Sequence, residues 1–310
     1  MTKKRDEPEK ARMTWNTLLV WSLIVLLGII DGVWLLAKGM SLAPDALLPT
    51  FLPILGTSAL AWFYTHIRPD RRIAALTHMA AVMLAFTTVT AVLSYLTVTL
   101  CQPLVDPYLV AADRALGLDW PTMYAWVAAH AHIHKYMRLI YITLIPQMVV
   151  LQVILNFRGQ IMRAWELQWL FILACLGCLF FSGIWPAAGA FSYFHAQLGE
   201  PYLHDFEALR NGALKVIGSG GVQGVIQFPS LHTALAVLFI YATRGLRVLF
   251  LLFALLNILV IVTTPAIGGH HFADLWGGAV LALAVIWIIR QNFMEKLFLK
   301  LKASKKEMPA

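Results

Sequence analysis

The sequence has few charged residues and few cysteines. Of its 310 residues, 60% are hydrophobic and 13% are charged, against about 45–50% apolar and about 25% charged residues in soluble proteins. This balance excludes an ordinary soluble domain, and no internal repeat is evident. Cys175 and Cys178 form a C-x-x-C within an apolar run. Because no second pair of ligands accompanies them, we interpret both as packing residues rather than as a redox or metal site.

Long apolar segments predict an all-α fold, a polytopic bundle of transmembrane helices. Several segments reach the roughly 20 residues that a helix needs to cross a bilayer, and the short alternating pattern of a transmembrane barrel is absent. The start, MTKKRDEPEKARMTW, runs into the first apolar segment without a cleavage site, which favours a retained span. The eight expected spans cover residues 15–38, 44–67, 73–100, 136–157, 166–188, 229–243, 246–267 and 270–290, of which the sixth is the shortest.

Basic residues are concentrated on one side of the predicted bundle. The formal net charge is +8, and 18 of the 24 Lys and Arg residues fall in the two chain ends and in the connections after spans two, four and six. Positive residues accumulate in cytoplasmic loops, so we interpret the charge as a signal of orientation and exclude nucleic acid as a partner. We therefore expect a multi-pass protein of the plasma (inner) membrane. Both of its termini are expected in the cytoplasm. The connections before spans six and eight are expected to face the periplasm or lumen.

The first of these connections carries the stretch QFPSLHTALAV, residues 227–237. Proline is typical of the first turn of a helix, so we expect a helix to begin near Ser230. The free N–H groups and the positive dipole end of such a helix form an anion site, to which the Ser230 hydroxyl adds a donor. The alternative is that Ser230 merely caps the helix and His232 is an interfacial histidine.

The second connection carries the stretch GGHHFADLWGG, residues 268–278. His270 and Asp274 are four residues apart, so on a helix they share one face and the carboxylate can accept a hydrogen bond from the imidazole. This contact would make the other ring nitrogen a better nucleophile; the alternative is a purely structural pair. Gly268 and Gly269 permit close approach of the backbone to a ligand.

Together the two stretches can form one site for phosphoryl transfer. A helical hairpin can bring them together on the same face of the membrane. In-line transfer needs a nucleophile on one side of phosphorus and a proton donor on the other. Two histidines with reference pKa values of about 6.5 can share those roles near neutral pH.

The two motifs resemble a known family. Pro-Ser-x-His, from Pro229 to His232, followed by His-x-x-x-Asp-x-x-x-Gly, from His270 to Gly278, resembles the type 2 phosphatidic acid phosphatase superfamily of membrane lipid phosphatases and phosphotransferases. FPSLHTA and GGHHFAD are most similar to the branch that contains inositol phosphorylceramide synthase and its bacterial relatives. Further resemblance lies in DRALGLDW (113–120), WPAAGAFSYF (185–194) and FEALRNG (206–212). The resemblance implies a six-span core (73–290), preceded by a tail with two accessory spans (1–72) and followed by a basic cytoplasmic tail (291–310).

The resemblance also implies roles for individual residues. His270 would attack phosphorus to form a phosphohistidine, and Asp274 would orient it. His232 would protonate the departing group and later activate the acceptor, while Ser230 would hold phosphate oxygens. The substrate would be a lipid phosphate, the acceptor water or a lipid alcohol, and no metal or other cofactor would be needed. His271 would line the pocket.

Two basic signatures of that superfamily are missing from this sequence. Lys-x6-Arg-Pro is absent, and Thr263-Thr264 stand where Ser-Arg usually precedes the nucleophile. We therefore expect Arg210 and Lys215, in the loop that leads to Ser230, to bind phosphate, with Arg210 as the preferred clamp. The alternative function is a noncatalytic lipid-phosphate binding or transport protein that retains the pocket.

Two other segments have weaker interpretations. HAHIH, residues 130–134, could bind a metal if it were extended, although alternate residues diverge on a helix. Residues 104–120 have apolar side chains at helical spacing and are expected on the outer surface, partly covering the site.

Overall fold

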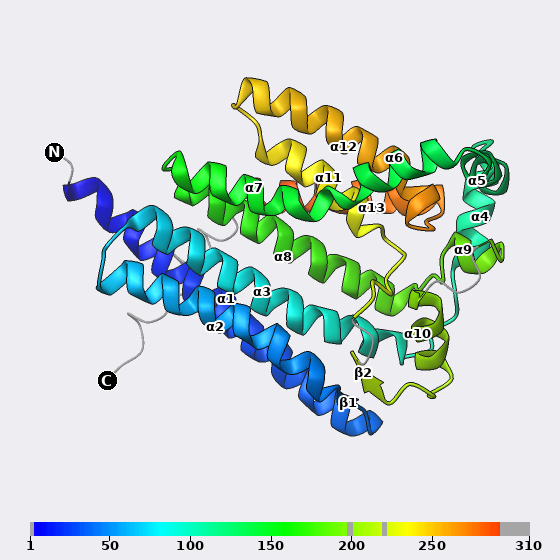
Figure 1. The fold of residues 1–310 in the computed structure, drawn as a ribbon, viewed down its shortest axis with the longest axis horizontal. Helices are drawn as coiled ribbons and strands as arrows, with labels where there is room; N and C mark the ends of the chain where they lie inside the picture. The colour runs from blue at the N-terminus through cyan, green and yellow to red at the C-terminus, as the bar shows by residue number, and fades with distance from the viewer. Residues whose placement is uncertain (1–2, 197–200, 219–221, 292–310) are drawn as a thin grey trace.

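The computed structural model describes residues 3–196, 201–218 and 222–291, and the fold is all-α apart from two short strands. Most of the basic tail predicted at 291–310 thus lies outside the described residues. The longest helices run roughly along the long axis of the molecule (Figure 1). They are α1 (Lys3–Lys38), α2 (Pro44–His66), α3 (Arg71–Val98), α8 (Ile161–Ile184), α12 (Arg247–Ile267) and α13 (Phe272–Arg290), together with the consecutive pair α6 (Ala131–Ile142) and α7 (Leu144–Phe157).

Seven segments of the described chain are long and apolar enough to cross a membrane, which confirms a multi-pass helical bundle. The expected span at 229–243 differs, because its helix α11 (Leu231–Ala242) has 12 residues. The chain before it, residues 222–230, is not helical. The far end of α11 reaches the level at which α8 begins, since Arg163 donates to the carbonyls of Ala242 and Arg244 at 2.7 Å. Irregular backbone at membrane depth is tolerated where it is buried in protein.

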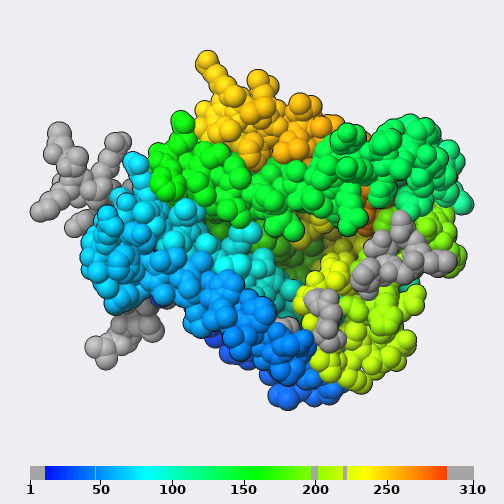
Figure 2. All heavy atoms as spheres, in the orientation of Figure 1, coloured from blue at the N-terminus to red at the C-terminus, as the bar shows by residue number. Residues whose placement is uncertain are grey.

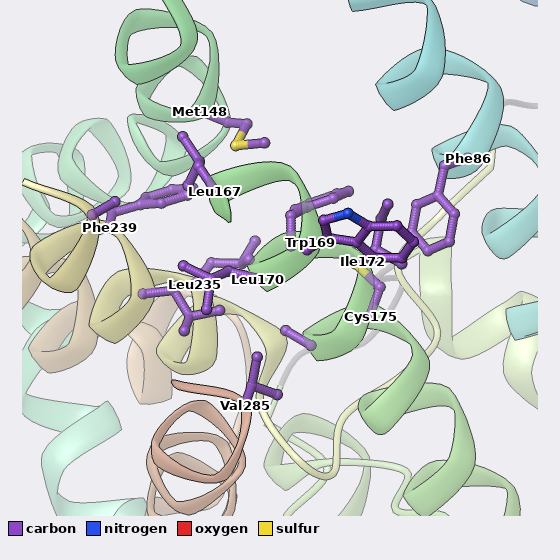
Figure 3. Close-up of a cluster of buried hydrophobic side chains, with 14 of the residues drawn as sticks. Phe86, Met148, Leu167, Trp169, Leu170, Ile172, Cys175, Leu235, Phe239 and Val285 are labelled. Carbon is purple, nitrogen blue, oxygen red and sulfur yellow. The ribbon is translucent and has the colours of Figure 1, made fainter. Parts of the chain in front are cut away.

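Helix α8 lies at the centre of the bundle. It is the most buried of the seven segments, whereas α2 is the least buried. Figure 3 shows Leu170 of α8 among side chains from neighbouring helices, including Leu235 of α11 and Val285 of α13. Cys175 and Cys178 are buried free thiols in this core, which fits their interpretation as packing residues. The apolar face of α8 therefore holds together the helices that carry the two motifs.

The short elements gather at one end of the bundle (Figure 1). They are α4 (Asp106–Ala115), α5 (Trp120–Ala129), α9 (Ala190–Tyr193), α10 (Pro201–Arg210), β1 (Ser41–Leu42) and β2 (Val216–Ile217). The strands pair in parallel, with Ser41 opposite Val216. This pairing joins the connection between α1 and α2 to the loop that leads toward α11.

Candidate active site

Ser230 directly precedes α11, and it does not itself line the cavity that is lined by His232 and His270. The helix begins where the sequence predicts, and the Ser230 side chain accepts a hydrogen bond from the Thr233 amide at 3.3 Å. Ser230 is therefore the N-cap, which is the alternative to a role in phosphate binding. Its own amide donates to the carbonyl oxygen of Asp274 at 3.1 Å. The two motifs are therefore joined directly through their backbones, and Ser230 is completely buried at this junction.

His270 and Asp274 form the predicted pair by a different geometry. The distance between His270 Nδ1 and Asp274 Oδ2 is 3.2 Å, and both residues are buried. They do not share a helix face, because α13 begins at Phe272. Asp274 instead lies in the first turn and reaches back, where the same oxygen also accepts from the His271 amide at 2.8 Å. The carboxylate thus caps α13 and orients His270 at once.

The imidazole of His270 is neutral at physiological pH. His270 lies in the connection between α12 and α13, and its pKa falls from the usual 6.5 to about 3. Burial is the main cause, because it disfavours the charged form; His271 adds to the shift, and a hydrogen bond with the backbone of Gln227 opposes it. A neutral ring whose Nδ1 faces Asp274 leaves Nε2 as the nucleophilic nitrogen.

His232 lies on the other side of the same cavity. The ring centroids of His232 and His270 are 6.4 Å apart. The Tyr141 ring stacks on His232, with centroids 4.3 Å apart, and its hydroxyl lies 3.3 Å from His232 Nδ1. These three residues, together with Gln227 and Gly268, line a cavity of about 580 Å³. Figure 2 shows the surface hollowed between α3 and the α6–α7 pair.

Buried residues of α4 also hold the connection between α12 and α13, which carries His270 and His271. His271 Nε2 lies 3.0 Å from Asp106 Oδ1, and both side chains are buried. Asp106 also accepts from the amides of Ala188 and Gly189, at 2.9 and 2.8 Å. The expectation that His271 lines the pocket is wrong, since its ring pairs with a carboxylate of α4 and is absent from the cavity wall.

Asp113, about two turns after Asp106 on the same face of α4, caps the start of α13. Its carboxylate accepts from the amides of Phe272 and Ala273 at 3.0 and 2.8 Å. The donors at this helix terminus are thus satisfied by protein carboxylates, whereas at the start of α11 the Thr233 amide donates to the Ser230 hydroxyl oxygen. The sequence predicts that the segment 104–120 lies on the surface and partly covers the site, but none of its residues lines the cavity. It instead binds the His271 side chain and the amides of Phe272 and Ala273.

The predicted phosphate ligands are not all brought together. The Arg210 guanidinium donates to the Gln102 carbonyl at 3.0 Å and lies over the Phe206 ring, and Lys215 is exposed with its ammonium 3.5 Å from the Lys38 carbonyl oxygen. Neither residue lines the cavity, and among the described residues no other Lys or Arg does. Their assignment as phosphate ligands stays a prediction.

Gly269 shapes the site through its backbone. It adopts a φ of +67°, and a Cβ at this position would overlap the buried ring of Phe191. Its carbonyl oxygen accepts from the Ala190 amide at 2.6 Å. A glycine is required here by both conformation and space, and this is the close approach predicted for the pair Gly268-Gly269, made to protein rather than to a ligand.

Gly278 sets the spacing between the two motif helices. A Cβ there would overlap the carbonyl oxygen of Ser230 and lie 3.1 Å from Thr233 Cβ. We expect Gly278→Ala to push α13 from α11, lowering the unfolding free energy by about 1–3 kcal/mol and reducing activity. Thermal unfolding in detergent measures the first effect. Gly56→Ala is the control, because nothing lies within 4 Å of its added Cβ; equal Tm shifts in the two variants would contradict this packing role.

Sequence reasoning missed Tyr141, Asp106 and Asp113. The two aspartates had a usable signal, since they are seven residues apart on an amphipathic segment and so face the same way as its apolar residues. Tyr141 had none, because an aromatic residue near a membrane interface is ordinary. Its role depends on where α6 crosses α11.

The residues described by the structure form a multi-helix membrane protein with a buried site of two histidines and an orienting carboxylate. Among them, no group of three His, Cys, Asp or Glu side chains is placed to hold a metal ion, HAHIH included. The chain belongs to the PAP2 superfamily, which it matches over residues 107–288, from α4 to α13. Members of this superfamily are generally phosphatases. Comparison with curated proteins and with solved structures found no match.

Proposed function

We propose that the protein takes a phosphoryl group from a membrane lipid onto His270 and passes it to water or to an alcohol. The observation that carries this proposal is that His232 and a neutral His270, which is held by Asp274, line the same cavity. His270 Nε2 attacks phosphorus and His232 protonates the departing oxygen. Both act on the same phosphate, because their rings are 6.4 Å apart between centroids.

The phosphate is held by the start of α11 in this proposal. The free N–H groups of its first turn and the dipole of the helix attract an anion, and the Ser230 hydroxyl retains a proton to donate. Arg210 and Lys215 remain the proposed cationic ligands, and to reach the site they would leave the carbonyls of Gln102 and Lys38.

A second cavity supports a lipid as the substrate. It has a volume of about 610 Å³ and lies between α3, α7, α8 and α11, with an almost wholly apolar wall. It meets the first cavity at His232 and Leu231. From Thr87 to Leu76 it follows α3 for about 16 Å, at about 1.5 Å per residue. A hydrocarbon chain fits such a space, so the proposed substrate keeps its phosphate at His232 and its tail among these helices.

The finer predictions from the sequence belong to this proposal. We propose that the protein belongs to the branch resembling inositol phosphorylceramide synthase, because FPSLHTA and GGHHFAD are similar to that branch. The distribution of basic residues supports cytoplasmic termini and a site on the periplasmic or lumenal side. The proposed division is a tail with two accessory spans (1–72), a six-span core (73–290) and a basic tail (291–310).

Covalent capture tests the proposal. Detergent-purified protein is incubated in EDTA with a panel of lipid phosphates and phosphodiesters labelled at phosphorus, with and without an added lipid alcohol. We expect acid-labile label on His270, located by mass spectrometry of peptides, and turnover sensitive to vanadate. Product identity separates hydrolysis from transfer. Binding of labelled lipid without label on His270 and without turnover would instead support a noncatalytic lipid-phosphate binding or transport protein, an alternative favoured by the lack of Lys and Arg among the described residues that line the cavity.

A further inference from the structure

Tyr141 of α6 contacts His232, the proposed proton donor, in two ways. Its ring lies nearly parallel to the imidazole of His232, at 14° between planes. Its hydroxyl lies 3.3 Å from Nδ1 of the same ring. A Cβ on Gly268 would lie 2.7 Å from this hydroxyl oxygen, so the glycine next to the His270 connection leaves room for it. Tyr141, Gly268 and both histidines line one cavity.

We propose that Tyr141 is a positioning residue that determines which nitrogen of His232 exchanges protons with the substrate. The tyrosine oxygen accepts a hydrogen bond from Nδ1–H of His232, which keeps the proton on Nδ1 and leaves Nε2 for chemistry. The stacked phenol also stabilises the imidazolium form, as an aromatic face does for a cation. This inference rests on the proposed role of His232.

The proton and electron movements follow from this arrangement. When anionic phosphate is bound, it favours the imidazolium form of His232. The lone pair of His270 Nε2 attacks phosphorus, the bond from phosphorus to the departing oxygen breaks, and that oxygen takes the proton from His232 Nε2. In the second step, the acceptor O–H gives its proton to His232 Nε2 and its oxygen attacks phosphorus. The phosphorus–nitrogen bond then breaks and returns the electron pair to His270. Nδ1–H stays on the Tyr141 oxygen throughout.

The variant Tyr141→Phe separates this role from packing. Phenylalanine keeps the stacked ring and removes the hydrogen-bond acceptor. General acid catalysis is worth about 10²–10⁴-fold, and we expect loss of its positioning to slow label transfer to His270 about tenfold from hexadecyl phosphate, whose leaving alkoxide needs a proton. Transfer from a long-chain nitrophenyl phosphate, whose leaving group needs none, is expected to change less than about twofold. Tyr136→Phe is the control, since Tyr136 lies on the same helix and is exposed.

A double variant sharpens the test. If Tyr141 acts through His232, adding Tyr141→Phe to His232→Ala changes the rate no further, because interacting residues are not additive. The inference would be overturned if Tyr141→Phe slowed label transfer equally from both substrates, or from neither. It would also be overturned if the effects of the two substitutions were additive in the double variant. Absence of label from either substrate in the wild-type protein would count against the proposed function instead.

Discussion

Replacing His270 with alanine is expected to stop label transfer from lipid phosphates and to lower turnover by at least about 10⁴-fold, since loss of a nucleophile removes the covalent step. The remaining groups cannot take its place. His232 lies across the cavity with Nδ1 beside Tyr141, and Asp274 is fully buried behind the missing ring. The rate of phosphate release or headgroup transfer by purified protein measures the effect.

The matched control for this change is His132→Ala. His132 is an exposed residue of α6 at the same end of the bundle, so its loss alters histidine content and surface but leaves the cavity intact. We expect wild-type turnover for the control and an unchanged Tm for both variants to within a few degrees. Turnover by His270→Ala at the level of the control would show that the phosphohistidine mechanism is wrong.

Among substitutions of residues that do not line the cavity, Asp106→Asn is expected to have the largest effect on stability and on label transfer. The carboxylate accepts three hydrogen bonds, from Ala188, Gly189 and His271. An amide has one oxygen, and its NH₂ group would face a donor, so at least one buried donor loses its acceptor. Each such loss costs about 1–3 kcal/mol.

We therefore expect Asp106→Asn to lower the Tm in detergent by about 5–10 °C, taking about 2–4 °C per kcal/mol for a chain of this order of size. Label transfer to His270 is expected to slow as well, even at temperatures at which the variant remains folded, because the connection that carries the nucleophile is held through His271. Asp119→Asn is the control, an exposed carboxylate at the start of α5. If both variants gave the same Tm and labelling rate, the positioning role of Asp106 would be contradicted.

Much of the architecture follows from local patterns. Apolar length alone predicts eight spans, and seven of them correspond to segments that are long and apolar enough to cross a membrane, because each helix satisfies its own backbone hydrogen bonds. Pro229 and Ser230 predict where α11 begins, since capping depends on neighbours in sequence. The span predicted at 229–243 departs from this pattern. Its helix is short because the chain before it is shaped by contacts at the site rather than by hydropathy.

The sequence by itself determined that this protein is a membrane-embedded helical bundle and that His232, His270 and Asp274 belong to one site, because these features reside in composition and in short spacings. Only the tertiary structure decided which residues surround them. Tyr141 comes from α6 and Asp106 and Asp113 from α4, while Arg210 bonds to the Gln102 carbonyl. These contacts join residues that are 91 to 165 positions apart along the chain. Such contacts arise from how helices cross, and the periodicity of each helix records only which face is apolar.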